Sequence, residues 1–272
     1  MQSITSITPI TSITKDVDCH IMNLNALIKQ HGSASHTFPS GIRYFKIDDK
    51  YYLGYANGFQ FNYYGCCKYK DGSYYYGGWV EGERYGSGTY MYADGTTYVV
   101  GNWKNGALDG YGHIFYGNGS IFKGDFKNGL PNGSGTLKTQ HSIKSGRWLN
   151  GALHGPGKEI FINGNTYVGN FFSDVKCGEG TIYYADGGKL SCTWKDDKKE
   201  GKGVYLFPDC SKKYEGIWKD DKNIEFDQVM FMISIRSFTN NLRLVSAANI
   251  TVSSLPLCLT SLQKLTAALV KQ

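Results

Sequence analysis

The sequence predicts an all-β fold, an elongated and twisted solenoid (a meander) of about seven to eight β-hairpins with short helical or irregular ends. Three observations lead to this prediction. Glycine is abundant, with 35 residues in 272, while aromatic residues still make up 15% of the chain. A large aromatic residue recurs every 22 to 24 residues. Glycine pairs and turn dipeptides recur at constant distances from it, which is typical of a repeat array.

The composition excludes several classes of protein. A disordered chain lacks aromatic residues in this number, and a collagen has glycine at every third position beside abundant proline. The longest nearly unbroken apolar stretch, Val229 to Ile235, is far shorter than the ~20 residues of a membrane-spanning helix. The first residues, MQSITSITPITSIT, contain no early basic residue and no apolar run, so we expect no secretory signal.

The distribution of charged residues and of cysteines excludes further classes of function. The formal net charge of +6 is spread over the chain, and the stretch Lys189 to Lys222 holds nine lysines beside seven carboxylates. Such a mixture predicts a solvated surface and no nucleic-acid partner. The seven cysteines are scattered and include no Cys-x-x-Cys pair, so we expect neither a metal site nor a disulfide framework. They indicate reduced thiols in a cytoplasmic protein.

The repeat consists of an aromatic anchor and, after six of the eight anchors, a Gly-x-Gly pair seven and nine residues later. The structural anchors are Tyr55, Trp79, Trp103, Phe126, Trp148, Phe171, Trp194 and Trp218. The repeat glycines are Gly86, Gly88, Gly110, Gly112, Gly133, Gly135, Gly155, Gly157, Gly178, Gly180, Gly201 and Gly203. All five tryptophans of the chain are anchors, which points to a repeated packing role.

The dipeptide that precedes each anchor strand predicts a hairpin turn. Asp94-Gly95 and Asn118-Gly119 are examples, and such pairs supply the positive φ angles of a type I′ turn. In the strand that follows, aromatic, glycine and aromatic alternate, as in Tyr75-x-Gly77-x-Trp79, so all three face one side. Aromatic rings packed over the repeat glycines are therefore the expected core. Three units depart from the pattern: Tyr55 lacks the following Gly-x-Gly pair, one unit has Gln140-His141 at its turn, and another has Leu190 and Cys192 in place of aromatic and glycine.

The two ends differ from the array, which gives three regions. Residues 1–40 are a low-complexity, partly disordered segment with a short helix expected from Asp18 to Gln30. Residues 41–221 are the repeat array. Residues 222–272 are a capping segment, with a strand from Gln228 to Ile235 and then either a leucine-rich-repeat-like fragment or an amphipathic helix from Leu257 to Lys271. We favour the helix, because it would cover the open edge of the sheet.

These motifs resemble those of the MORN (membrane occupation and recognition nexus) repeat family. The similarity is best in YYYGGWVEGERYGSGTYMYADG and YVVGNWKNGALDGYGHIFYGNG and extends over about residues 51–221. The resemblance implies a twisted array of β-hairpins. It also implies roles in scaffolding, self-association, cytoskeletal or ciliary attachment and contact with membranes.

The sequence contains no motif for catalysis or cofactor binding. No Gly-x-Gly pair continues to Gly-x-Gly-x-x-Gly, and GALHGPGK lacks the spacing of a phosphate loop. The six histidines are dispersed, and we interpret His113 and His154 as ordinary strand or loop residues. We therefore expect no catalytic residue, no cofactor and no metal.

The leading hypothesis is a non-catalytic scaffold or adaptor that binds a helix or peptide of a partner protein in the groove of the array, at a membrane or cytoskeletal structure. The first alternative is a peripheral tether that binds anionic phospholipid. The second is a regulatory segment related to those attached to lipid kinases and methyltransferases; the ends of this chain are too short to hold such an enzyme.

Overall fold

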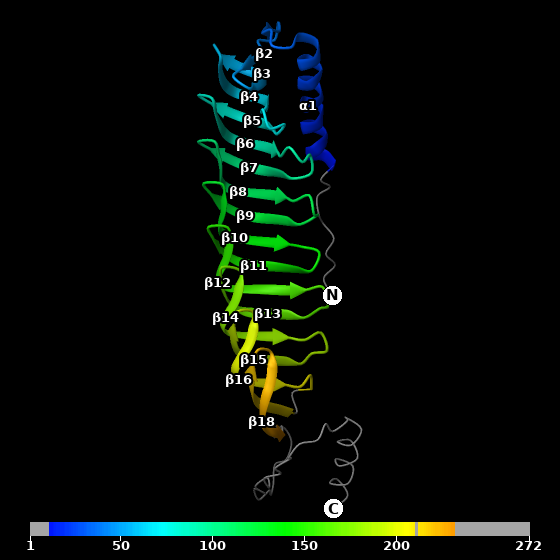
Figure 1. Cartoon of the computed structure of the whole chain (residues 1–272), viewed down its shortest axis with the longest axis vertical. Coiled ribbons are helices and arrows are strands. Elements are labelled where there is room, and N and C mark those ends of the chain that lie inside the picture. The colour runs from blue at the N-terminus through cyan, green and yellow to red at the C-terminus, as the bar shows by residue number, and fades with distance from the viewer. Residues whose placement is uncertain (1–10, 210–211, 232–272) are drawn as a thin grey trace, which may run out of the picture. The chain divides into compact units, whose positions relative to one another are not determined.

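The structure, a computed structural model, describes residues 11–209 and 212–231, all within one compact unit. They form one helix and a single open antiparallel sheet of 18 strands (Figure 1), which confirms the predicted all-β solenoid of hairpins. The elements are α1 (Thr11–His31), β1 (His36–Thr37), β2 (Arg43–Ile47), β3 (Lys50–Asn57), β4 (Gln60–Lys68), β5 (Tyr74–Val80), β6 (Glu83–Met91), β7 (Tyr98–Lys104), β8 (Ala107–Phe115), β9 (Ile121–Lys127), β10 (Leu130–Lys138), β11 (Ser142–Leu149), β12 (Ala152–Phe161), β13 (Thr166–Phe172), β14 (Val175–Tyr183), β15 (Lys189–Lys195), β16 (Lys198–Leu206), β17 (Lys212–Lys219) and β18 (Lys222–Phe231).

Every strand pairs with the next one along the chain, so the sheet is a continuous meander. Paired residues of an antiparallel sheet point to the same side, so the register assigns each side chain to a face. We call the side that carries Tyr75 and Trp79 the inner face and the side that carries Tyr74 and Tyr76 the outer face. A single hairpin buries little apolar surface, and stability comes from stacking each hairpin on the next.

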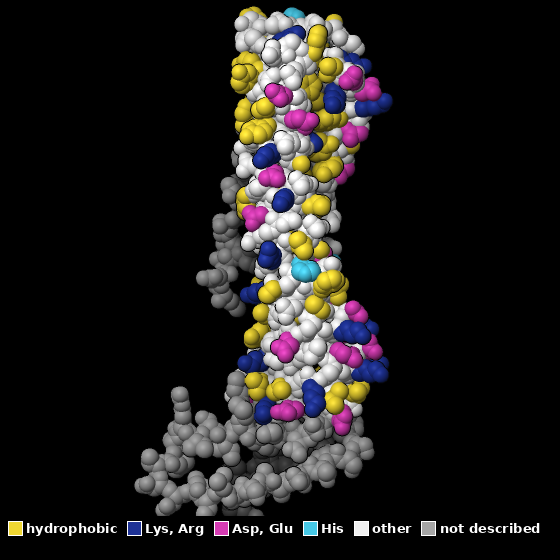
Figure 2. Space-filling model, turned by 90° about the vertical axis from the view of Figure 1, so that its left-hand side faces the viewer, with side chains coloured by type: hydrophobic (Ala, Val, Ile, Leu, Met, Phe, Trp, Pro, Cys, Tyr) yellow, Lys and Arg dark blue, Asp and Glu magenta, His cyan; other side chains and the backbone are white. Residues whose placement is uncertain are grey.

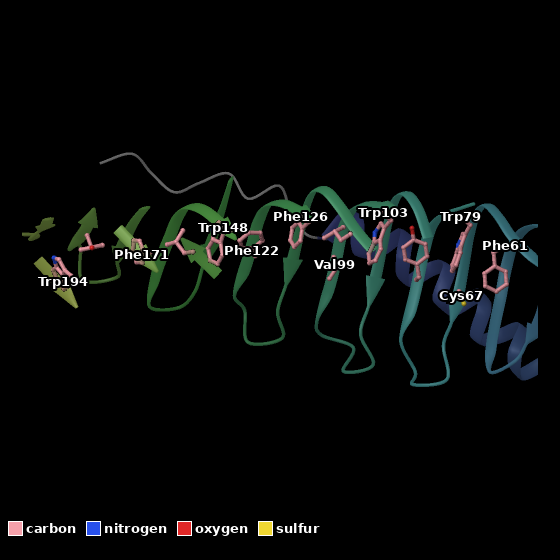
Figure 3. Close-up of a cluster of buried hydrophobic side chains, with 14 of the residues drawn as sticks. Phe61, Cys67, Trp79, Val99, Trp103, Phe122, Phe126, Trp148, Phe171 and Trp194 are labelled. Carbon is pink, nitrogen blue, oxygen red and sulfur yellow. The ribbon is translucent and has the colours of Figure 1, made fainter. Parts of the chain in front are cut away.

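The main core lies on the inner face, where aromatic rings pack over glycine. Tyr75 is fully buried, and a Cβ atom placed on Gly88 would lie 2.1 Å from its hydroxyl oxygen. Tyr167 lies in the same way over Gly180. Figure 3 shows the anchors Trp79, Trp103, Phe126, Trp148, Phe171 and Trp194 following one another along the array. Only glycine leaves room for a ring this close to the backbone.

The type I′ turns lie at a different place from the one predicted. In Asp94-Gly95 only the glycine has a positive φ angle, at 66°. The carboxylate of Asp94 instead accepts hydrogen bonds from the N–H groups of Thr96 and Thr97, in an Asx turn within a six-residue loop. Both residues have positive φ at the dipeptides that follow the anchors: Glu81-Gly82, Asn105-Gly106, Asn128-Gly129, Asn150-Gly151, Ser173-Asp174, Asp196-Asp197 and Asp220-Asp221.

These type I′ turns also link neighbouring hairpins. The second residue of each turn donates its N–H to a carbonyl of the preceding hairpin, as Gly106 does to Arg84 O at 3.1 Å. In the last turns an aspartate replaces glycine and adds a reciprocal bond: Asp174 Oδ1 accepts the N–H of Leu153, and Asp197 Oδ1 accepts that of Lys176, both at 3.0 Å. This second bond compensates for the less favourable positive φ of a residue with a side chain.

Two hairpins depart from the regular pattern. In the first, Tyr55 was predicted as the anchor, but it is 44% exposed. The register places Gly54 opposite Gly65 and Ala56 opposite Phe61, so Ala56 occupies the anchor position and Tyr55 points to the other side. In the unit with Gln140-His141, the loop between β10 and β11 has only three residues, and the indole nitrogen of the buried Trp148 makes no hydrogen bond. The equivalent nitrogen of Trp103 donates to Gly88 O at 3.1 Å.

The ends of the described region extend beyond the expected boundaries. The helix runs from Thr11 to His31, longer than the Asp18–Gln30 helix predicted, and residues 11–15 belong to it. The sheet continues through β18 to Phe231, which includes the first part of the strand expected from Gln228. The capping helix expected at Leu257–Lys271 lies outside the described residues.

Candidate protein-binding surface

The outer face carries a helix at one end of the sheet. The buried Leu24 of α1 packs with Tyr44 and Cys66, and the half-buried Ile21, Leu27 and Ile28 surround them. Their spacing of three and four residues places them on one side of the helix. In Figure 1, α1 lies beside the first strands of the array, where it contacts β3, β4 and β5.

Polar and aromatic contacts fix α1 on this face. Asn25 Oδ1 accepts hydrogen bonds from Lys68 Nζ at 3.2 Å and from the Tyr74 hydroxyl at 3.0 Å. The ring of His20 stacks on that of Tyr76, with centroids 4.1 Å apart. The helix therefore combines an apolar stripe with one amide that bridges two strands.

The same face continues past α1 with a second group of aromatic side chains. Tyr74 and Tyr76 pair with Met91 and Thr89 of β6, which pair with Tyr98 and Val100 of β7. Those in turn pair with Phe115 and His113 of β8, and Phe115 pairs with Ile121 of β9. We call the following six residues the β7–β9 patch: Tyr98, Val100, Tyr111, His113, Phe115 and Ile121.

The rings of the β7–β9 patch contact one another. Tyr98 and Phe115 are stacked, with centroids 4.5 Å apart, and His113 lies edge-on to Phe115 at 6.0 Å and to Tyr111 at 5.4 Å. Tyr111 is 57% exposed, and the other members are half-buried. Burial, and to a lesser degree the charge of Lys123, lowers the pKa of His113. The patch is thus an apolar surface with a neutral imidazole at its centre at pH 7.

Lysines border this patch on the outer face. Following the register beyond β9, Lys123 pairs with Thr136, which pairs with Ser145 and then Lys158, and Ile121 pairs with Lys138. Asp125 of β9, which pairs with Tyr111, accepts the N–H of Ser134 at 2.9 Å. By contrast, the side of the array seen in Figure 2, the left-hand side of Figure 1, has basic and acidic side chains interspersed.

The inner face contains a polar interruption that the sequence analysis missed. Lys144 and Glu159 pair directly at positions where the neighbouring hairpins carry Phe122 and Leu137. Glu159 is buried, lies 2.8 Å from Lys176 Nζ and accepts a hydrogen bond from the Ser142 hydroxyl at 2.8 Å. The ammonium of Lys176 also lies over the rings of Phe161 and Tyr167. These contacts are those of a structural ion pair enclosed by the core.

Burial makes three cysteines of the described residues unreactive. Burial raises the pKa of the Cys66 and Cys67 thiols to about 12, so neither is a nucleophile at neutral pH. Burial likewise raises the pKa of Cys192 to about 11. In residues 11–209 and 212–231 no three His, Cys, Asp or Glu side chains gather as metal ligands would. In the same residues no helix is sufficiently long and apolar to cross a membrane.

The structure brings the predicted repeat residues together on the inner face. Seven of the eight anchors are buried there, and Tyr55 is the exception. The two glycines of a Gly-x-Gly pair have different roles. Gly88 lies under the ring of Tyr75, whereas Gly86 has a φ of 71° and no atom within 4 Å of where a Cβ would lie. The outer-face patch was not predicted, although Tyr98, His113 and Phe115 alternate with core residues, which is the signal that marks them as facing the other side.

Comparisons with known proteins support the repeat assignment. The family model described as MORN repeat matches six segments: residues 75–97, 100–121, 122–139, 145–166, 167–189 and 193–209. The resemblance seen in the sequence is thereby confirmed over these segments. A search of the curated proteins found no match.

Two solved structures share a weak likeness with the chain. One is the wild-type TCP10 domain of Danio rerio CPAP in complex with a peptide of Danio rerio STIL, at 15% identity and a TM-score of 0.37, covering 72% of this chain and 98% of that one. The other is the SAS-4 (dCPAP) TCP domain in complex with a proline-rich motif of Ana2 (dSTIL) of Drosophila melanogaster, at 15% identity and a TM-score of 0.31, covering 67% of this chain and 87% of that one. At these scores we base no argument on them.

Proposed function

The chain is a MORN-repeat protein, with six repeats between residues 75 and 209, and we propose that it is a non-catalytic scaffold that binds a partner protein. The observation that carries the proposal is the outer face of the sheet. It holds α1 over one set of strands and presents exposed and half-buried aromatic residues over the next. An apolar patch bordered by polar residues is typical of a protein interaction site.

The non-catalytic part of the proposal is supported by how the buried titratable groups are used. Glu159 and Lys176 neutralise each other inside the core. The hydroxyl groups of Tyr52 and Tyr167 donate to backbone carbonyls of their own hairpins, at 2.8 and 3.2 Å. In these contacts each group stabilises the fold, which supports a non-catalytic role.

A membrane tether is the main competing function. Lys123, Lys138 and Lys158 lie on the same face as the aromatic patch, and a basic surface with aromatic residues suits an anionic lipid surface. We prefer a protein partner, because the patch lies on the face that already binds a helix. Self-association, a cytoskeletal attachment and a cytoplasmic location belong to the scaffold proposal, and a regulatory segment related to those attached to lipid kinases and methyltransferases is the second alternative.

Two measurements on the same protein separate these functions. The purified full chain is sedimented with anionic liposomes at low and at physiological salt, and proximity labelling is carried out in cells that express it. We expect no liposome binding and a recurrent labelled protein. Salt-sensitive liposome binding without a recurrent protein would contradict the scaffold proposal and favour the tether, since screening by salt weakens attraction to anionic lipid.

A further inference from the structure

The outer face continues without a break from the strands under α1 to the β7–β9 patch. We call a series of residues that pair with one another from strand to strand a row. Tyr76 lies beneath α1, and its row continues through Thr89, Val100 and His113. The row of Tyr74 runs through Met91, Tyr98 and Phe115. The two rows that bind α1 thus continue into five of the six residues of the patch, and the sixth, Tyr111, lies on the next row, opposite Asp125.

From this continuity we infer that the β7–β9 patch binds an amphipathic helix of the partner protein, laid end to end with α1 and bearing acidic residues beside its apolar stripe. The inference rests on the proposed scaffold function and names the site and the chemistry of the partner. The way α1 binds defines what this face accepts: apolar side chains three and four residues apart, placed over tyrosine rings.

The dimensions of the face suit a helix. Strands in a sheet are about 4.8 Å apart, so the distance from β7 to β12 is about 24 Å. A helix rises 1.5 Å per residue, and about 16 residues would cover this distance. The 21 residues of α1 show that a helix of similar length already lies across strands of this sheet.

The charges along these two rows specify the partner further. From β6 to β12 the rows contain three charged residues at neutral pH, all of them lysines: Lys123, Lys138 and Lys158. A helix with glutamate or aspartate at the edges of its apolar stripe would pair with them, and a basic helix would be repelled. The part of the sheet beneath α1 also carries a lysine, Lys68 of β4. Its ammonium donates a hydrogen bond to the neutral side chain of Asn25 in α1.

The test places a photo-crosslinking amino acid, p-benzoylphenylalanine, in the full chain at Tyr111, the most exposed member of the patch. A matched variant carries it at Phe172, which is 63% exposed at the end of β13. Both are expressed in cells of the organism that encodes the chain, and the crosslinked peptides are identified by mass spectrometry. We expect crosslinks from position 111, and not from position 172, to a segment of another protein with apolar residues at helical spacing and flanking carboxylates.

Two variants then test the patch in the crosslinking protein. Lys123→Glu with Lys138→Glu reverses the border charge without touching the core, and we expect it to reduce the crosslink about tenfold, since charge pairs are replaced by like-charge contacts. Tyr98→Ser with Phe115→Ser removes the stacked rings and is expected to abolish it. Unchanged thermal unfolding shows that each variant is still folded.

Three outcomes would overturn the inference. Crosslinks from position 111 to this chain itself, whether to residues 1–10, to residues 232–272 or to a second copy, would mean that the patch has another occupant. Protein crosslinks from position 172 alone would overturn the helix site and leave the scaffold function intact. An absence of protein crosslinks from either position, together with liposome binding, would contradict both.

Discussion

Cys66 and Cys67 are consecutive residues of β4, yet they are buried in two different cores: Cys66 lies under α1 with Leu24, and Cys67 lies on the inner face with Tyr52 and Tyr75. The alternation of side chains along a strand produces this separation. The two thiols therefore report independently on the helix and on the array.

Loosening α1 is expected to expose one of these thiols and not the other. In Leu24→Lys a buried apolar side chain is replaced by a charge, so α1 should detach from the outer face. Because both thiols have a pKa of about 12, alkylation by iodoacetamide at pH 8 should be slow in the native protein. Site-resolved mass spectrometry should find faster labelling of Cys66 in the variant and unchanged labelling of Cys67. Equal acceleration at both sites would contradict the two-core arrangement.

The packing of rings over glycine predicts a difference between two equivalent positions. Gly88→Ala would place a Cβ atom 2.1 Å from the Tyr75 hydroxyl oxygen, whereas in Gly112→Ala the closest atom, on Leu108, is 3.0 Å away. We expect Gly88→Ala to lower the free energy of unfolding by about 1–3 kcal/mol and Gly112→Ala by less. Chemical denaturation of both variants tests this. If the two variants lose the same stability, the ring of Tyr75 does not set the requirement for glycine.

The buried ion pair predicts strong coupling between its members. Glu159→Ile alone leaves the ammonium of Lys176, which is only 12% exposed, facing Asp197 as its remaining partner, and should cost about 3–5 kcal/mol. The double variant Glu159→Ile, Lys176→Leu carries apolar residues like those of the neighbouring hairpins and should recover most of that loss. A double-mutant cycle measures the coupling energy between the two side chains. If the losses of stability in the two single variants add up in the double variant, the two side chains are not coupled, which would contradict the prediction.

Protonation of His113 is expected to make the stability of the protein depend on pH. Burial and the nearby Lys123 lower its pKa below the ordinary 6.5, so the unfolded chain binds more protons than the folded one as the pH falls below about 6.5. Stability contributed by the neutral imidazole is present above pH 6.5 and is lost as the pH decreases toward the folded pKa. His113→Gln should reduce the slope of the unfolding free energy between pH 7 and pH 5. An identical slope in the variant would mean that other groups cause it.

Much of the inner face could be predicted from the sequence, because its pattern is local. The alternation in Tyr75-x-Gly77-x-Trp79 assigns three side chains to one face without any knowledge of the fold. The type I′ turns at Ser173-Asp174 and Asp196-Asp197 could not be predicted in this way. They contain no glycine, and the carboxylates that stabilise them accept N–H groups of the preceding hairpin, which is a contact between repeats.

The outer face could not be predicted for a different reason. Tyr74 and Tyr98 each begin their strand and lie on the same row, and nothing in either repeat says which of the two contacts a helix. That depends on α1, a segment outside the repeats whose docking is a long-range contact. The first anchor, by contrast, follows the local alternation: in Tyr52-x-Gly54-x-Ala56 the inward position falls on Ala56, as it falls on Trp79 in the second hairpin, so the constant spacing of aromatic residues was the wrong guide to Tyr55.

The most direct test of a scaffold that binds through its outer face is the amount of partner that copurifies with the tagged full chain. Wild type, the patch variant Tyr98→Ser with Phe115→Ser, and the control variant Phe172→Ser with Tyr183→Ser are compared by quantitative mass spectrometry. We expect the recurrent partner to fall about tenfold or more with the patch variant and to stay unchanged with the control, because a few buried aromatic residues dominate such interfaces. Equal recovery with all three proteins would contradict the account.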